Sequence, residues 1–321
     1  MSTIAQPVAQ PVSAQATQEA TGISLKHILV ATDFSPASTR AFDFALALAQ
    51  RYGSELHVVH ALSPHVREAV PLDPLPRELN RERLQAEREM ADMDKGPRMK
   101  DVPHHLMLRP GEVWDVLHSI IRSEKVDLLV MGTHGRGMLK KLALGSVAEE
   151  VLRQAECPVV TVGPHVAVAD VIDSRTILFA TDFGRASTRA LPYALSIAQQ
   201  TGAKLVLLHM VPPVPAMQAG YVPAVFGSDD LLQWRSALRE QSMKKLKELV
   251  PPGTLAQKPE YVVAGDFLPG GILFAAAEHK ADLIIMGANR STTPRIAAHL
   301  PWPVVHDVIC ESRCPVLTVS A

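Results

Sequence analysis

ILVATDFSPASTRAFDFALALAQRYGSELHVVHAL, from Ile28 to Leu62, returns 149 residues later as ILFATDFGRASTRALPYALSIAQQTGAKLVLLHMV, from Ile177 to Val211. The two stretches align without a gap, and 18 of the 35 aligned residues are identical. Farther along, VDLLVMG is repeated as ADLIIMG, and CPVVTV as CPVLTV. Chance similarity between two amphipathic stretches would not repeat three segments in one order. The chain of 321 residues therefore contains one domain used twice.

Each copy alternates short apolar runs with helical patterns. Residues 27–33 are an apolar run that ends in polar turn residues, as a buried strand does. In residues 35–53 apolar side chains recur at helical spacing; Ser35 and Pro36 suit the start of a helix and Gly53 suits its end. The same criteria predict further strands at 55–62, 104–111, 127–132 and 158–164, and further helices at 77–98, 113–125 and 146–154.

Strands that alternate with helices predict a parallel sheet covered by helices on both faces. We expect an α/β fold made of two tandem copies of a doubly wound, mainly parallel five-stranded sheet. The expected domains are residues 23–164 and 175–321, joined by a linker at 165–174. Residues 1–22 are expected to be a flexible tail, and the Pro-rich residues 211–228 a loop or lid.

The composition argues against several classes of protein. The 32 Lys and Arg residues against 33 Asp and Glu give a net charge of −1, without the basic excess typical of proteins that bind nucleic acid or anionic membranes. Three cysteines are too few for a disulfide framework, so we expect reduced thiols. The N-terminus has no signal-peptide or transit-peptide pattern, and no window reaches about 18 uninterrupted apolar residues. These features predict a cytoplasmic protein.

A glycine-rich segment follows the strand predicted at 127–132. It reads GTHGRGMLKKLALGS, from Gly132 to Ser146, with Gly135 and Gly145 between them. Ligands of open parallel sheets bind beyond the carboxyl ends of the strands, which is where this segment begins. Glycines let backbone amides approach an anion, and Gly145 with Ser146 opens a helix whose first amides and dipole favour negative charge. The segment therefore has the features of a phosphate cradle.

Through these residues the chain resembles the universal stress protein family (UspA-like). The resemblance covers nearly all of the sequence after residue 23. Nucleotide-binding members of that family carry GxxGx9G(S/T), which Gly132, Gly135, Gly145 and Ser146 match. The resemblance implies a tandem member with an adenine nucleotide alpha hydrolase-like fold. It also implies a stress-response module that binds ATP, or another adenine nucleotide, together with Mg²⁺.

The resemblance further implies which residues contact the nucleotide. Asp33 would approach the phosphates and their Mg²⁺, and Ala61 would contact adenine through its backbone. Asp33 could instead cap the helix that follows it, and the two roles are compatible. The full set of expected binding residues is Ala31, Thr32, Asp33, Ala61, Met131, Gly132, Gly135, Gly145, Ser146 and Val147.

The second copy departs from this motif. It keeps Asp182 and Gly287, but Arg290 stands where the second glycine is expected. Counted back from the shared CPV segment, Trp302 and Pro303 replace Gly145 and Ser146. Proline has no amide to donate and Trp fills the volume of a phosphate, so we expect a degenerate second site. Arg290 and Arg295 could still hold an anion there, or could be ordinary surface residues.

Other candidate residues are weaker. His60 and His209 occupy equivalent positions at strand ends, and His134 lies inside the glycine-rich segment as a potential phosphate neighbour. Cys310 and Cys314 are four residues apart and could form a redox pair. Neither GxSxG, HxGH, KMSKS nor a GxxxxGK(S/T) phosphate loop is present, so no residue is assigned a catalytic role.

Three functional hypotheses therefore remain. The chain is an ATP-binding regulatory module, a slow ATPase, or an interaction protein that needs no nucleotide. In the family it resembles, apolar terminal strands pair across a twofold axis. Here the PVVTV strand of one copy is expected to pair with the PVLTV strand of the other inside one chain. Two such chains would then form a homodimer. A protein partner is also expected, and the sequence does not identify it.

Overall fold

The computed structural model describes most of the chain. The described residues are 23, 25–62, 75–135, 144–166, 175–211, 228–265, 268–288 and 302–321. The predicted tail at 1–22, most of the linker predicted at 165–174 and nearly all of the Pro-rich segment predicted at 211–228 lie outside these ranges. Arg290 and Arg295 lie outside them as well.

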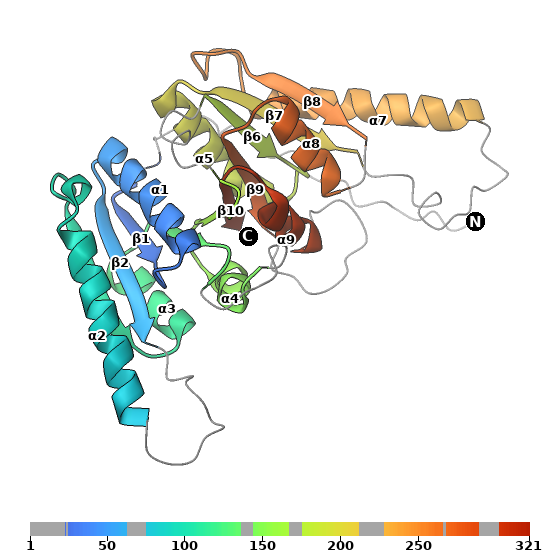
Figure 1. The fold of residues 1–321 in the computed structure, drawn as a ribbon. Helices are drawn as coiled ribbons and strands as arrows, with labels where there is room; N and C mark the ends of the chain where they lie inside the picture. The colour runs from blue at the N-terminus through green and yellow to red at the C-terminus, as the bar shows by residue number, and fades with distance from the viewer. Residues whose placement is uncertain are drawn as a thin grey trace.

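The described strands form one continuous ten-stranded sheet in the order β3-β2-β1-β4-β5-β10-β9-β6-β7-β8 (Figure 1). Each copy contributes five strands, and all pairs within a copy are parallel. The predicted α/β fold with two five-stranded halves is therefore confirmed. The strands are β1 His27–Ala31, β2 Glu55–Leu62, β3 His104–Pro110, β4 Leu128–Gly132, β5 Val159–Val162, β6 Thr176–Ala180, β7 Lys204–Met210, β8 Glu260–Ala264, β9 Leu283–Ala288 and β10 Val316–Ser320.

Helices follow most of the strands, as the sequence pattern predicts. In α1, Ser35 is the N-cap and accepts a hydrogen bond from the Ser38 amide, and Gly53 ends the helix with φ 63°. The helix predicted at 77–98 instead ends at Asp94, because Gly96 and Pro97 begin a separate 3-10 turn, η2 Pro97–Met99. The helices are α1 Pro36–Tyr52, α2 Leu75–Asp94, α3 Val113–Ser123, α4 Ser146–Gln154, α5 Arg185–Thr201, α7 Ser228–Leu249, α8 Gly270–Glu278 and α9 Trp302–Glu311. None of the helices that can be described is at once long and apolar enough to cross a membrane.

The two copies are joined through their last strands. β5 and β10 pair antiparallel, with Val160 opposite Leu317. Two threonine hydroxyls reinforce the pairing, since Thr161 donates to the Val316 carbonyl and Thr318 to the Val159 carbonyl, each at 3.3 Å. The expected pairing of the two terminal strands inside one chain is thus confirmed. It removes two exposed strand edges that could otherwise pair with another chain.

Apolar side chains cover both faces of this sheet across both copies. On one face, α3 and α4 of the first copy and α8 and α9 of the second pack on the strands in a single buried cluster. On the other face, α1 and α5 pack against the strands, with α2 and α7 contributing at the outer ends. The core is built from Ala, Val, Leu and Ile with few aromatic side chains, as the 5% aromatic content predicts.

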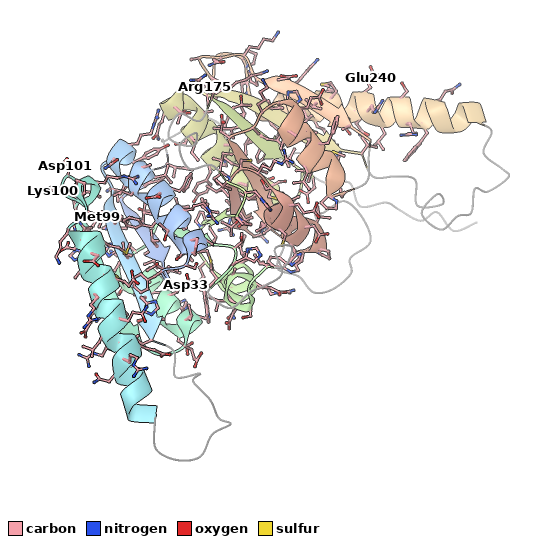
Figure 2. All side chains as sticks on the ribbon, viewed as in Figure 1. Asp33, Met99, Lys100, Asp101, Arg175 and Glu240 are labelled. Atoms are coloured by element: carbon pink, nitrogen blue, oxygen red, sulfur yellow. The ribbon has the colours of Figure 1, made fainter. Side chains whose placement is uncertain are left out.

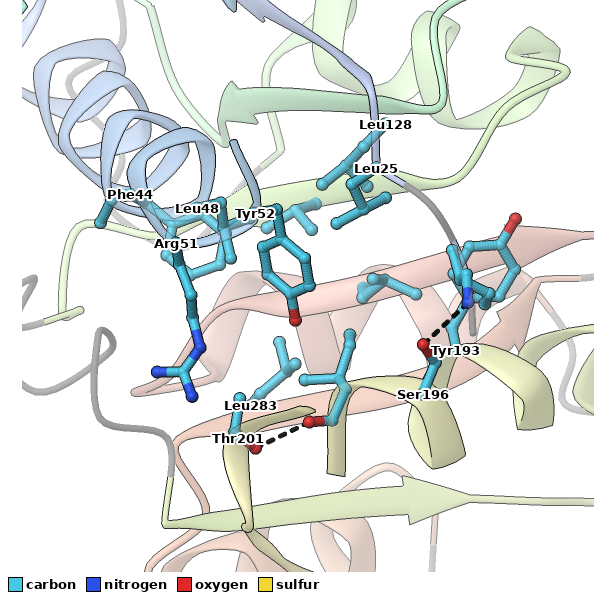
Figure 3. A pocket seen from close by; sticks show the side chains of 15 residues that line it. Leu25, Phe44, Leu48, Arg51, Tyr52, Leu128, Tyr193, Ser196, Thr201 and Leu283 are labelled. Carbon is cyan, nitrogen blue, oxygen red and sulfur yellow. Dashed lines mark hydrogen bonds between the residues drawn. The ribbon is translucent and has the colours of Figure 1, made fainter. Parts of the chain in front are cut away.

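A small apolar cavity of about 40 Å³ marks the seam between α1 and α5 (Figure 3). Leu25, Tyr52 and Tyr193 are among the side chains that line it. Two hydrogen bonds between backbone and side chain also join the copies here. The Ile23 amide donates to Ser196 Oγ at 2.9 Å, and Arg51 Nη2 donates to the Gln200 carbonyl at 3.1 Å. The seam is therefore held by packing and by hydrogen bonds between the copies.

Candidate functional site

A larger cavity, of about 320 Å³, opens at the carboxyl ends of the strands in the first copy. It lies where the chain leaves β1 between β2 on one side and β4 on the other, the place where ligands of open parallel sheets bind. All ten residues that the sequence analysis expected at a nucleotide line this cavity: Ala31, Thr32, Asp33, Ala61, Met131, Gly132, Gly135, Gly145, Ser146 and Val147. The fold thus brings together four separate segments of the sequence.

Asp33 lies just after β1 (Figure 2). The Thr32 amide donates to the Val59 carbonyl at 2.9 Å, and Thr32 Oγ1 accepts the Phe34 amide at 3.0 Å. Phe34 adopts a left-handed conformation with φ 58°, which only a strongly held turn imposes on a side chain of this size. Asp33 Oδ1 accepts the Ser35 amide at 3.1 Å. Because Ser35 itself caps α1, this carboxylate is not the N-cap of the helix.

The two glycines after β4 have different physical roles. A Cβ on Gly132 would stand 2.9 Å from the Ala37 carbonyl carbon and 3.1 Å from the Ser38 amide, so glycine lets α1 approach β4 closely. A Cβ on Gly135 would stand 2.9 Å from Asp33 Oδ2, so this glycine brings backbone beside the carboxylate. Gly132 therefore serves packing, and Gly135 shapes the cavity.

The start of α4 forms another wall of the cavity. Its N-cap is Gly145, which has no side chain to accept the first-turn amides, and Ser146 is exposed. The Gly145 amide donates to the Thr133 carbonyl at 2.9 Å, which ties α4 to the end of β4. The first-turn amides of a helix have no partner within the helix, and its dipole is positive at that end. This wall is suited to an anion.

Two histidines also line the cavity. His60 Nδ1 lies 2.7 Å from the Thr32 carbonyl, so this nitrogen carries the proton and donates. The His60 ring packs 4.7 Å from the Phe34 ring, between centroids. His134 Nδ1 lies 2.7 Å from Thr133 Oγ1. Both side chains are thus oriented by neighbours within the cavity wall.

Sequence reasoning missed some of the lining. Val59, Val113 and Leu117 supply apolar surface, while Ser38 and Thr133 supply hydroxyl groups. Ser38 carried a signal, because it belongs to the ASTRA segment that the second copy repeats. Val113 and Leu117 come from α3, whose approach to this end of the sheet follows from packing and not from any local motif.

The corresponding region of the second copy is built differently. Gly184 replaces the N-cap Ser35, and Asp182 Oδ1 accepts both the Gly184 amide at 2.8 Å and the Ser187 hydroxyl at 2.7 Å. Asp182 thus holds the turn before α5 through the same backbone bond that Asp33 makes to Ser35, and it adds a bond to a helix hydroxyl without capping the helix. Trp302 is the first residue of α9, and Pro303, which has no amide to donate, follows it in the first turn.

The cysteines lie in the core and not at either site. All three are free and buried, and Cys314 lies beyond the end of α9, not on the same helix as Cys310. Burial raises the pKa of both Cys310 and Cys314 to about 11. Thiols with raised pKa values are poor nucleophiles at neutral pH, which argues against the redox pair.

The fold and cavity define a tandem α/β protein with a cavity at the strand ends of its first half. The sequence profile of the universal stress protein family matches residues 24–163 and again residues 174–320. The chain therefore belongs to the universal stress protein family, as a member with two such domains.

Several known proteins are similar to this chain. A universal stress protein of Thermus aquaticus, from the QAH/OAS sulfhydrylase 3′ region, is 39% identical over 145 residues, which cover 43% of this chain and 98% of that protein. A crystal structure of a universal stress protein from Archaeoglobus fulgidus matches with a TM-score of 0.63 at 20% identity, covering 93% of this chain and 99% of that chain. A universal stress protein in complex with cAMP is 25% identical, covering 44% of this chain and 98% of that chain, with a TM-score of 0.33.

Proposed function

We propose that the first copy, residues 23–164, binds one adenine nucleotide, ATP with Mg²⁺ in particular, and that the second copy, residues 175–321, acts mainly as its pseudo-symmetric partner. One observation carries the proposal. Ten residues expected at a nucleotide, from four separate segments, line one cavity whose wall includes the open start of α4. The chain would then be a regulatory module in which nucleotide occupancy alters the binding of a protein partner.

The residues of the cavity fit the parts of a nucleotide. The amides of Ser146 and Val147, at the positive end of α4, suit phosphate oxygens. Gly135 keeps the volume beside Asp33 open, and a carboxylate oxygen is the ligand that Mg²⁺ prefers. Ala61 at the end of β2, with Val59 behind it, offers a backbone edge and apolar surface for a base. When bound, Mg²⁺ would supply neutralisation of phosphate charge.

Equilibrium dialysis of the full chain against labelled ATP with Mg²⁺ tests the proposal. We expect a stoichiometry near one per chain, because Trp302 and Pro303 stand where the second copy would need Gly and Ser. Binding of two nucleotides per chain, or of none, would contradict it. Inorganic phosphate measured in the same samples tests the alternative of slow hydrolysis.

A pair of exchanged variants sharpens this experiment. Gly145→Trp gives the first copy the residue of the second and should abolish binding, because the indole occupies the volume of the phosphates. Trp302→Gly makes the matching change in the second copy and should leave binding at one per chain, since Pro303 still lacks an amide. Thermal unfolding of both variants controls for loss of the fold.

Two further expectations belong to this proposal. With a net charge of −1 and its universal stress protein domains, the chain is proposed to act in the cytoplasm, without nucleic acid or membrane partners. Two tandem chains are proposed to associate as a homodimer. Light scattering across a concentration series tests this association, and a monomer at every concentration would contradict it.

A further inference from the structure

Four polar side chains meet at the opposite end of the first copy from the cavity. They are His27 in β1, Glu55 and His57 in β2, and His105 in β3. The parallel register sets His27 beside Glu55 and His57 beside His105. Because Glu55 and His57 are two residues apart on one strand, their side chains point to the same face, and so do those of their neighbours in register. The topology thus gathers three imidazoles and one carboxylate on one face of the sheet.

The distances between these groups are short. Glu55 Oε2 lies 3.3 Å from His27 Nδ1, and Glu55 Oε1 lies 2.7 Å from His105 Nε2. The ring centroids of His27 and His57 are 5.7 Å apart, and those of His57 and His105 are 5.4 Å apart and stacked. One potential ligand atom each from His27, Glu55 and His57 lies within 4.8 Å of the other two.

His57 is the buried member of the group. His57 is only 2% exposed, yet its Nε2 has no hydrogen-bond partner among the described residues. A buried ring nitrogen without a partner is costly, and such a group needs an explanation. An imidazole nitrogen that no other group occupies can bind a metal ion through its lone pair.

The second copy shows how the same place is filled without such a cluster. Thr176 stands for His27, Lys204 for Glu55 and Val206 for His57 in the repeat, and Glu260 stands beside Val206 as His105 does beside His57. Lys204 Nζ and Glu260 Oε2 form an ion pair at 2.5 Å. In the second copy an apolar side chain and an ion pair thus occupy this place. In the first copy nitrogen and oxygen donors surround a buried ring nitrogen.

We propose that His27, Glu55 and His57, with His105 as the fourth ligand, bind one divalent transition metal ion of the Zn²⁺ class. Imidazole nitrogens with one carboxylate form a donor set that favours Zn²⁺, Co²⁺ or Ni²⁺ over Mg²⁺ or Ca²⁺. A tetrahedral ion with bonds of about 2.1 Å holds its ligand atoms about 3.4 Å apart, and those of His27, Glu55 and His57 already lie within 4.8 Å of one another. The ion would join β1, β2 and β3 and give His57 Nε2 a partner. This site is distinct from any Mg²⁺ bound with a nucleotide.

Titration of the untagged, EDTA-treated full chain with Co²⁺ tests this site, because tetrahedral Co²⁺ has intense visible absorption bands. We expect the bands to saturate at one Co²⁺ per chain and to disappear when Zn²⁺ is added. His57→Gln and Glu55→Gln should each raise the apparent dissociation constant of Co²⁺ by more than about tenfold, since loss of an outer-shell partner alone weakens metal sites by that amount. If His57→Gln unfolds the chain, the partly exposed His27→Gln supplies the same test.

His104→Gln is the matched control. His104 is the neighbour of His105 on β3 but points to the other face, where its Nε2 lies 2.9 Å from Asp94 Oδ1. Titration of this variant with Co²⁺ should give the same absorption bands and the same dissociation constant as the natural chain. Absence of the Co²⁺ bands, or bands that survive both His57→Gln and His27→Gln, would overturn the proposal. The titration is done without nucleotide, so its outcome is independent of whether the cavity binds ATP.

Discussion

The guanidinium carbon of Arg153, in α4, lies 4.6 Å from the centre of the Trp302 ring at the start of α9. The residue that stands in the second copy for Gly145 is therefore a contact between the two copies. Arg153 additionally pairs with Glu149 one turn earlier, at 2.8 Å, which orients it over the ring. Where the first copy has Gly145, the second copy thus has a side chain that contacts the first copy.

Exchange of Trp302 should measurably weaken this contact. Trp302→Leu keeps apolar packing but removes the aromatic face, so we expect a loss of about 1 kcal/mol in the free energy of unfolding. Arg153→Gln should cost a similar amount, and the double variant should cost less than the sum of the two. Urea unfolding of the four proteins measures the coupling energy. Strictly additive losses would contradict an interaction between the two side chains.

The two glycines after β4 should respond differently to the same substitution. Gly132→Ala places a Cβ 2.9 Å from the backbone of Ala37, so we expect destabilisation of about 1–3 kcal/mol. Gly135→Ala meets only the carboxylate end of Asp33, which can rotate, so we expect a stability change below about 1 kcal/mol together with weaker ATP binding. Urea unfolding and calorimetric titration with ATP separate the two effects. Equal loss of stability in both variants would contradict these roles.

Much of the fold could be predicted from the sequence because the signals were local or repeated. The repeat from Ile28 and Ile177 predicted two copies, and Ser35 and Gly53 predicted the ends of α1. The end of α2 was missed because helical periodicity continues past Asp94 while Gly96 and Pro97 break the helix. Local breakers thus override an amphipathic pattern.

The sequence predicts those lining residues of the cavity that belong to a motif. It does not predict the lining residues that only helix packing brings to the cavity. The motif of the resembled family predicts Gly135 as a binding residue, and this glycine lies beside Asp33. Leu117 reaches the cavity only because α3 crosses this end of the sheet, which no local pattern reveals. The group around His57 was missed for a similar reason: its members lie on three strands, and only the register brings them together.

Removal of the Tyr52 hydroxyl should stabilise the chain. This oxygen is buried at the seam between α1 and α5 with no hydrogen-bond partner among the described residues, and burial raises the pKa of Tyr52 (Figure 3). Tyr52→Phe should therefore raise the free energy of unfolding by about 1 kcal/mol. Tyr261→Phe is the control, because its hydroxyl donates to the Val250 carbonyl at 3.4 Å and its loss should not stabilise. A less stable Tyr52→Phe chain would mean that the hydroxyl has a partner.

Two histidines should give opposite pH dependences of stability. Burial lowers the pKa of His209, against the opposing effects of its bond to the Thr181 carbonyl and of Asp182, whereas the hydrogen bond to Asp94 raises the pKa of His104. His209 thus contributes stability above the ordinary pKa of about 6.5 that is lost as the pH falls. His104 contributes stability below that pKa that is lost as the pH rises through its folded value.

Variants that cannot titrate isolate these two contributions. Across pH 5 to 8, the free energy of unfolding of the natural chain minus that of His209→Asn should increase with pH. The same difference for His104→Gln should decrease with pH. Asparagine can still donate to the Thr181 carbonyl, which His209 Nδ1 contacts at 2.8 Å, so the comparison leaves this bond in place. Urea unfolding at several pH values measures both differences, and slopes of the same sign would show that one of the two assignments is wrong.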